Sequence, residues 1–194
     1  MTQAPKIVAL AGSIRKASYN KLLVRIAAEG ARSAGADVTF IDLADYPLPI
    51  FDEDLEAAEG MPENAARLKA HLVASDGILL AAPEYNSSIT GALKNVIDWA
   101  SRKTGDEPPL AAFSGKAAAL MAASPGALGG LRGLVHVRSI LSSIGVLVIP
   151  DQIAVPKAFE AFDTGGALRD PKLQARVQAL GGSLAALLSK LATE

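Results

Sequence analysis

The 194-residue chain contains no cysteine. That absence excludes disulfides, thiolate nucleophiles, and sites in which cysteine ligates zinc or an iron–sulfur cluster. If the protein carries out redox chemistry, its electrons must therefore reside on a bound organic cofactor. A chain without cysteine also fits the reducing cytoplasm, where we expect this protein.

Aromatic residues are scarce: they make up 5% of the chain, whereas hydrophobic residues make up 50%. The core must therefore be aliphatic and rich in alanine, which is typical of helices packed on a sheet of Val, Ile and Leu. Such a hydrophobic content argues against a disordered chain. The length fits one domain, and we expect residues 1–194 to form it.

Neither sign of charge dominates, because 19 Lys and Arg are balanced by 20 Asp and Glu, for a net charge of -1. The chain thus offers no strongly basic surface, and we expect no nucleic-acid partner. Its N-terminal stretch, MTQAPKIVALAGSIRK, holds one apolar run of about strand length. Such a run is too short to span a membrane and lacks the organisation of a signal peptide, so we expect no membrane contact.

Short apolar runs alternate along the chain with segments of helical periodicity. The runs predict strands at Lys6–Ala11, Asp37–Leu43, Gly77–Ala82, Lys116–Ala123 and Val146–Ile149. The periodic segments predict helices over Ser18–Ser33, from Pro62 to Leu72, over Leu93–Ala100, over Val137–Ile144 and from Asp170 to Leu191, with a loop over residues 44–60. Strands that are each followed by a helix indicate a parallel α/β sheet with both faces covered, in which ligands bind at the carboxyl ends of the strands.

The loop after the first strand, GSIRKASYN, leads directly into a helix. A helix N-terminus presents unpaired N–H groups and favours an anion. Ser13, Ser18 and Asn20 add polar donors and Arg15 adds a positive charge, which together suit the oxygens of a phosphate. The alternative is that Ser18 only caps the helix and that Arg15 is only solvated; the position after an apolar first strand favours phosphate binding.

The loops after the third and fourth strands carry groups that suit a flat ligand. Pro83, Glu84, Tyr85 and Asn86 follow the third strand, and their side chains and amides can bond to the edge of a flavin ring with Tyr85 beside it. The fourth strand is followed by Ser124–Gly130 (SPGALGG), whose glycines allow a close approach to such a ring. An ordinary polar turn and an ordinary glycine-rich turn are the alternatives.

Two other phosphate motifs can be compared with the first loop. A Walker motif is absent, because Gly115 and Lys116 precede a strand and not a helix. Only Gly12 of a GxGxxG motif is present, although Asp42 at the end of the second strand imitates the ribose-binding acid of a dinucleotide-binding Rossmann enzyme. A loop with one glycine and several hydroxyls suits a terminal monophosphate better than a pyrophosphate.

Two segments resemble the NADPH-dependent FMN reductase family, in particular its bacterial quinone and chromate reductase branch. GSIRKASYN, at residues 12–20, resembles the family's phosphate loop, and PEYNSSITGALKNVIDWAS, at residues 83–101, resembles its most distinctive segment. The resemblance runs from the first strand to Gly130. It implies a flavodoxin-like three-layer fold, with a five-stranded parallel sheet of order 2-1-3-4-5 and helices on both faces.

The resemblance also implies the cofactor, the substrates and the assembly. FMN is the expected cofactor, NADPH or NADH the electron donor, and a quinone, free flavin, azo dye or chromate the small-molecule acceptor. The family's members are usually dimers or tetramers, so we expect a homodimer or homotetramer, with the helix end Asp98–Arg102 and the loop after it as candidate contact surfaces. The implied FMN ligands are Ser13, Arg15, Ser18 and Asn20 for the phosphate, Pro83, Glu84, Tyr85 and Asn86 for the ring, and Ser124 and Gly126 in the third loop.

We expect the flavin to carry the chemistry without a catalytic side chain. Hydride passes from the nicotinamide to the flavin, and the acceptor then takes the place of the nicotinamide, which predicts ping-pong kinetics. The N–H groups of the Ser124–Gly126 turn are expected to stabilise negative charge on the reduced flavin. His71 and His136 fall on helical segments away from the three loops, Trp99 is interpreted as core packing, and no His, Asp or Glu spacing predicts a metal site.

The main alternative is a flavodoxin-type electron carrier that binds FMN without turning over a nicotinamide. Such carriers tend to be strongly acidic and to flank the ring with aromatics, whereas this chain is nearly neutral and has only Tyr85 in the ring loops. A regulatory domain that has lost its flavin is a further alternative, and the intact phosphate loop argues against it.

Overall fold

The apolar runs of the sequence form one parallel sheet in the computed structural model, which describes residues 3–192. Its strand order is β2-β1-β3-β6-β7, so the five strands, counted along the chain, follow the predicted order 2-1-3-4-5. Every residue of β3 and β6 is buried, which explains why these two strands read as continuous apolar runs. The strands are β1 (Lys6–Ala11), β2 (Asp37–Ile41), β3 (Gly77–Ala81), β6 (Ala117–Ala123) and β7 (Leu147–Val155).

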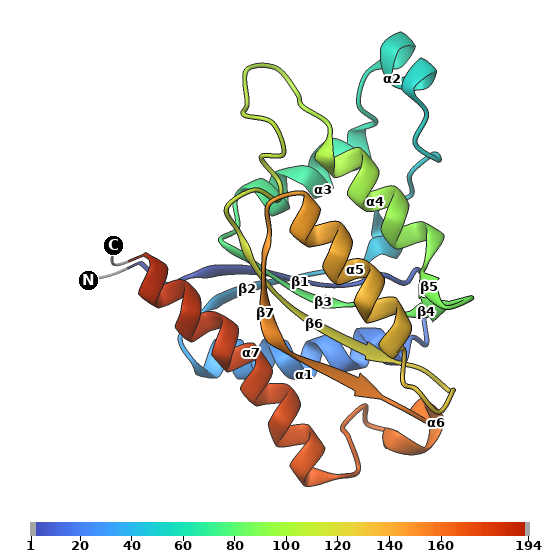
Figure 1. Ribbon diagram of the computed structural model, residues 1–194, viewed down its shortest axis with the longest axis vertical. Helices are drawn as coiled ribbons and strands as arrows, with labels where there is room; N and C mark the ends of the chain where they lie inside the picture. Colours follow the sequence, from blue (N-terminus) through green and yellow to red (C-terminus); the bar gives the residue numbers. More distant parts are fainter. Residues whose placement is uncertain (1–2, 193–194) are drawn as a thin grey trace.

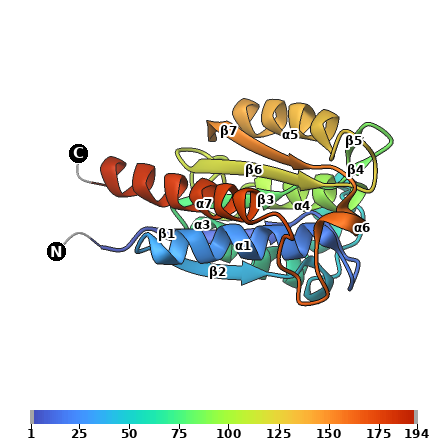
Figure 2. The same cartoon turned by 90° about the horizontal axis from the view of Figure 1, so that it is seen from below.

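Helices cover both faces of the sheet, as Figures 1 and 2 show. Because side chains alternate along a strand, Ile7 and Ala9 of β1 enter one hydrophobic core while Val8 and Leu10 enter the other. The first core includes residues of α1 (Tyr19–Ser33) and α7 (Pro171–Leu191); the second includes residues of α3 (Glu63–Val73), α4 (Gly91–Ser101) and α5 (Leu131–Ser143). The flavodoxin-like three-layer prediction is confirmed.

No helix within residues 3–192 is both long enough and apolar enough to cross a membrane.

Two strands end at places that differ from the prediction. β2 stops at Ile41, because Asp42 caps a short 3-10 helix, η1 (Leu43–Asp45), by accepting a hydrogen bond from the Ala44 N–H. β7 continues six residues beyond Ile149, past Pro150. An edge strand tolerates proline because one side of it needs no partner, and the β6–β7 register shifts near this point. Polar residues after Pro150 hid this extension in the sequence.

The structure also contains short elements that the sequence analysis missed. α2 (Glu53–Glu59) lies inside the predicted loop and begins after Asp52, whose carboxylate accepts from the Asp54 N–H. A hairpin of β4 (Glu84–Tyr85) and β5 (Ser88–Ile89) follows β3, and α6 (Ala158–Ala161) follows β7. Pro62, expected as the first helical residue, is instead the N-cap of α3.

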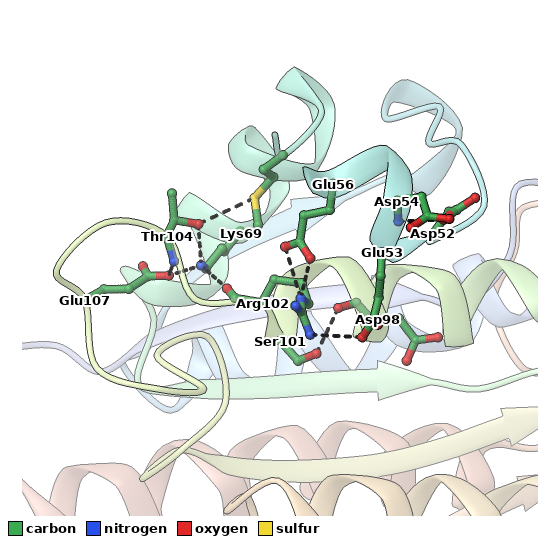
Figure 3. A network of polar contacts seen from close by, with 11 residues as sticks. Asp52, Glu53, Asp54, Glu56, Lys69, Asp98, Ser101, Arg102, Thr104 and Glu107 are labelled. Atoms are coloured by element: carbon green, nitrogen blue, oxygen red, sulfur yellow. Dashed lines mark hydrogen bonds and ion pairs between the residues drawn. The ribbon is translucent and has the colours of Figure 1, made fainter. Parts of the chain in front are cut away.

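The segment that carries α2 is fastened to one face of α4. Trp99 is fully buried, and its Nε1 donates to the Pro49 carbonyl over 2.9 Å. The Asn95 amide donates to the same oxygen over 2.8 Å. Arg102 Nε donates to Glu56 over 2.8 Å (Figure 3). The core-packing interpretation of Trp99 is confirmed. Arg102, which the sequence offered for a subunit contact, is paired inside the chain.

A buried lysine fastens the loop that follows α4. Lys69 of α3 donates to the Arg102 carbonyl, to Thr104 Oγ1 and to the Glu107 carboxylate (Figure 3). The Lys69 ammonium and the Thr104 N–H hold the pKa of Glu107 below its ordinary value, although partial burial opposes them. The α2 segment and the loop after α4 are therefore both held on the outer side of the helical layer.

Candidate functional site

The three predicted loops meet at the carboxyl edge of the sheet. Thr90, in the second loop, donates from Oγ1 to the Gly12 carbonyl in the first loop over 2.6 Å. Asn20, at the start of α1, donates from Nδ2 to the carbonyl of Ala123, the last residue of β6, over 2.8 Å. The loops after β1, β3 and β6 thus form one continuous rim, as the ligand rule for parallel sheets requires.

The first loop presents a run of free main-chain donors. α1 begins at Tyr19 with Ser18 as its N-cap, and its first turn holds no acidic residue. Within residues 3–192, no acceptor takes the N–H groups of Lys16, Ala17, Ser18, Tyr19 or Asn20. Consecutive free N–H groups at the positive end of a helix form a cradle for an anion.

Two buried serines and an exposed arginine belong to the same loop as this cradle. Ser13 and Ser18 are buried, and Ser13 Oγ accepts the Arg15 N–H over 3.3 Å. Ser18 stands at the N-cap of α1, as the alternative expected, but its hydroxyl makes no capping bond. The Arg15 side chain is exposed beside them. Their contact with a phosphate stays a prediction.

Asn20 is engaged more deeply than the sequence suggested. Besides the bond from Nδ2, its Oδ1 accepts the Ala123 N–H over 2.9 Å, and the side chain is buried. The amide therefore joins α1 to β6. Its main-chain N–H still belongs to the cradle, and a direct contact of its side chain with phosphate stays a prediction.

Glu84, predicted to lie along the ring, turns its carboxylate towards α5. Its Oε1 accepts from Arg132 Nη2 over 2.6 Å, and its Oε2 accepts the Gly133 N–H over 3.0 Å. Burial would by itself raise the pKa of Glu84, but the Gly133 N–H and the Arg132 guanidinium outweigh it and hold that pKa below its ordinary value. The side chain is thus an ionised anchor for the hairpin, and only its backbone remains for a ligand.

The rest of the second loop projects from the edge. Pro83 is buried beneath the β4–β5 hairpin, whereas Tyr85 is 53% exposed. Asn86 and Ser87 form the turn with φ of 51° and 66°, the left-handed conformation that tight two-residue hairpins need. The sequence shows Asn-Ser here and not the stronger Asn-Gly signal, so the hairpin was missed. Contacts of Pro83, Tyr85 and Asn86 with a ring stay predictions.

His136 lies closer to the loops than expected. Its Nδ1 is 2.9 Å from Ser88 Oγ in β5, so His136 contacts the β4–β5 hairpin. His136 lies on α5 four residues after Arg132, which contacts the same hairpin through Glu84. The expectation that it lies away from all three loops is wrong. His71, by contrast, contacts Tyr46 on the outer side of α3.

The third loop is fixed by a hydrogen bond to β7 and by a hydrogen bond within the loop. The Ser124 N–H donates to the Val155 carbonyl over 3.1 Å, and the Gly126 N–H donates to Ser124 Oγ over 3.2 Å. Pro125 has no N–H, so the Ser124–Gly126 turn has no free N–H group for a reduced flavin, and that expectation is corrected. Within residues 3–192 the free N–H groups of this loop belong to Ala127, Leu128 and Gly130.

Both carboxylate oxygens of Asp42 are bonded to other residues of the chain. Lys21 Nζ lies 2.6 Å from Oδ1 and donates to Oδ2 over 2.7 Å, and the Ala44 N–H donates to Oδ1 over 3.0 Å. Burial opposes ionisation, yet these partners and Arg25 hold the pKa of Asp42 below its ordinary value. These bonds tie the carboxylate to α1 and to η1, so a role in stabilising the fold accounts for the residue that imitated the ribose-binding acid of a dinucleotide-binding Rossmann enzyme.

An apolar hollow of ≈ 420 Å³ lies beside the first loop, lined by Ile14, Leu43, Leu48, Ala92 and Val96 among others. A hollow of ≈ 400 Å³ lies at the opposite, amino end of the strands, around Lys6, Asp76 and Lys116. Ligands of parallel sheets bind at the carboxyl end, so we assign the first of these hollows to the rim, together with a hollow of ≈ 360 Å³ lined by Lys16, Ala17 and Ser18 among others. The described residues contain no group of three His, Asp or Glu side chains that could hold a metal ion.

The sequence is similar to characterised reductases over nearly its whole length. The profile of the family described as NADPH-dependent FMN reductase matches residues 5–160. An NAD(P)H-dependent FMN reductase of Pseudomonas aeruginosa is 36% identical over 179 residues, 92% of each chain. An NAD(P)H:quinone oxidoreductase of Solanum tuberosum is 36% identical over 191 residues, 96% of this chain and 94% of the relative. A quinone reductase of Pseudomonas putida is 37% identical over 185 residues, 91% and 93% of the two chains.

Solved structures show the same fold. The flavoenzyme NAD(P)H:(acceptor) oxidoreductase FerB of Paracoccus denitrificans superposes with a TM-score of 0.79 and 29% identity, over 96% of this chain and 98% of that one. An archaeal flavodoxin superposes with a TM-score of 0.64 and 12% identity, over 94% and 98% of the two chains. The second similarity concerns the fold alone.

Proposed function

The chain belongs to the NADPH-dependent FMN reductase family and is an FMN-containing oxidoreductase with NAD(P)H as electron donor; we propose that it passes the electrons to quinones by a ping-pong mechanism. Free flavins, azo dyes and chromate are further acceptors that we propose for the same site. The proposal of a quinone is supported by relatives named for quinone reduction, three of which are more than 35% identical to this chain over nine tenths of its length.

The observation that carries the proposal is the row of free N–H groups at residues 16–20. A phosphate has several acceptor oxygens and a negative charge, and this row offers several donors at the positive end of α1. Ser13 and Ser18 add hydroxyls, and Arg15 adds a guanidinium that can pair with two oxygens. The residues present therefore fit the phosphate of FMN, and we assign them to it.

Residues of the second and third loops are those that we assign to the ring. FMN supplies two-electron redox chemistry when bound. Pro83, Tyr85 and Asn86 of the second loop and Ser124 and Gly126 of the third would line the ring. Glu84 is ionised and paired with α5, so it is no proton donor to the ring. We therefore assign positioning, and no acid or base role, to the protein side chains here.

A spectrum of the purified protein tests the cofactor assignment. We expect the yellow absorbance of bound flavin, release of FMN on denaturation, and bleaching when NADPH is added without oxygen. A flavodoxin-type carrier would be yellow too, but NADPH would not bleach it. A colourless protein that refuses added FMN would contradict the proposal.

Steady-state kinetics test the order of events. If the nicotinamide leaves before the quinone binds in the same place, parallel double-reciprocal lines are expected when both concentrations are varied. Intersecting lines, which indicate a complex holding both substrates, would contradict the ping-pong mechanism.

We also propose that the protein works as a homodimer or homotetramer in the cytoplasm. The absence of cysteine fits a reducing compartment. Size-exclusion chromatography with light scattering would give the mass of the assembly, and a mass of 20.0 kDa, that of one chain, would contradict this part of the proposal.

A further inference from the structure

Thr90 is a buried side chain at the start of α4 with two hydrogen bonds that point in different directions. Its hydroxyl accepts the Leu93 N–H over 3.1 Å, which caps α4, and donates to the Gly12 carbonyl over 2.6 Å. The second bond joins residues 78 positions apart in the sequence. Helix capping alone does not need it, so Thr90 has a second task at Gly12.

Gly12 is packed closely against α4 and is bonded on both sides. A Cβ at Gly12 would lie 2.8 Å from the Cβ and Cδ2 of Leu93, so the backbone of the first loop rests directly on the first turn of α4. The Gly12 N–H also donates to the Ala81 carbonyl over 2.8 Å. Both main-chain polar groups of Gly12 are therefore held, one by β3 and one by Thr90.

The other end of the same loop is held by Asn20. Its side chain pairs with both main-chain groups of Ala123, over 2.8 and 2.9 Å, and is 4% exposed. Thr90 is equally buried, at 4%. The loop that carries the free N–H groups of residues 16–20 thus runs between two fixed points, Gly12 and Asn20.

Fixed ends matter because a flexible loop must lose conformational freedom when it closes around an anion. A loop that is already ordered avoids that loss and binds its ligand more tightly. Neither fastening residue needs to touch the ligand to have this effect. The Thr90 hydroxyl is bonded to Gly12 and Leu93, and the Asn20 amide is bonded to Ala123.

We propose that Thr90 and Asn20 are positioning residues that hold the first loop in its phosphate-binding conformation, and that they set the affinity for the phosphate of FMN more than that for the ring. This inference rests on the proposed placement of the FMN phosphate in the first loop. It assigns to Thr90 a role that its position in a helix-capping motif does not reveal.

The test compares FMN with riboflavin, which has the same ring and no phosphate. Thr90→Val keeps the shape of the side chain and removes the hydroxyl, Thr90→Ser keeps the hydroxyl, and Thr39→Val makes the matched change at an exposed position on β2. Dissociation constants for both ligands are measured by flavin fluorescence on apoprotein, at a temperature at which circular dichroism shows every variant folded. We expect Thr90→Val to weaken FMN about tenfold and riboflavin less than twofold, whereas Thr90→Ser and Thr39→Val stay within twofold of the unmodified protein for both.

Equal weakening of FMN and riboflavin in Thr90→Val, or no weakening of either, would overturn the inference, because a merely structural role lowers both affinities together. If Thr90→Val does not fold, Asn20→Leu is measured in the same way, with the same expectation and the same refuting results. A second measurement is hydrogen exchange of the bonded amides of Ser13 and Arg15 in the apoprotein, which should quicken in either variant. Failure of the unmodified protein to bind FMN would contradict the proposed function instead and would be recognised before any variant is compared.

Discussion

At the scale of single residues, the chemistry of the rim depends on which polar groups the chain has already paired. Glu84, Asp42 and Asn20 all lie where the sequence suggested ligand contacts, and each is bonded to another part of the chain. Arg15 differs from them, because within residues 3–192 its guanidinium pairs with no carboxylate. That charge is therefore available to a ligand.

Replacing Arg15 by alanine should weaken FMN binding. A charge-assisted hydrogen bond to a phosphate contributes about 1.5–3 kcal/mol, so we expect the dissociation constant of FMN to rise roughly tenfold to a hundredfold. Arg176→Ala, an exposed arginine on α7, is the control. Fluorescence titration measures both, and an unchanged affinity in Arg15→Ala would remove Arg15 from the phosphate site.

Asp42 should make the folded protein less stable as the pH falls into the acid range. Because the pKa of Asp42 is lower in the folded chain than in the unfolded one, its contribution is complete above the unfolded value, about 3.9, and is lost as pH falls through the folded value. Thermal melting between pH 7 and pH 3 should show Asp42→Asn less stable at neutral pH, with a smaller further loss in acid than the unmodified protein. Asp37→Asn, an exposed neighbour on β2, should follow the unmodified protein. If the melting temperatures of the unmodified protein, Asp42→Asn and Asp37→Asn fall in parallel as the pH is lowered, Asp42 does not have this role in stability.

At the scale of elements, two glycines let α1 and α7 cross with their backbones in contact. A Cβ at Gly30 would lie 1.9 Å from the Gln178 carbonyl oxygen, and a Cβ at Gly181 would lie 1.9 Å from the Ala27 carbonyl oxygen. Glycine inside a helix costs about 1 kcal/mol relative to alanine. Here the close packing of the two helices outweighs that cost.

Replacement by alanine should therefore destabilise the protein at Gly30 and Gly181 but not at Gly182. Gly30→Ala and Gly181→Ala force the helices apart, and we expect each to lower the free energy of unfolding by about 1–3 kcal/mol or more. Gly182→Ala meets only ordinary contacts, at 3.6 Å and beyond, and should raise it by up to about 1 kcal/mol. Urea unfolding measures all three; a stabilising Gly181→Ala would contradict the observed crossing.

At the scale of the whole molecule, both hydrophobic cores share one sheet, so we predict that residues 1–194 unfold as a single domain. Calorimetry should show one transition. Saturating FMN at a hundred times its dissociation constant adds about 2.7 kcal/mol to stability, which should raise the melting temperature by roughly 5–10 °C. Two separate transitions, or a melting temperature indifferent to FMN, would contradict this prediction.

The candidate site was predictable where its signal is local. GSIRKASYN and PEYN mark the first two loops because each loop is a short continuous segment after an apolar strand. Thr90 had a local signal too, since it stands three residues before Leu93 at a helix start, as capping residues do. Arg132 and His136 had none, because their partners Glu84 and Ser88 lie 48 residues earlier.

The sequence by itself determined the fold class, the five sheet strands and the edge at which ligands bind, because apolar runs and helical periodicity are properties of neighbouring residues. Only the tertiary structure decided which polar side chains remain free for a ligand. That choice depends on partners such as Asn20 and Ala123, 103 residues apart, which meet because the sheet order places β6 within reach of α1. A one-dimensional pattern shows that a residue is polar, but its hydrogen bonds are fixed by what the fold brings next to it.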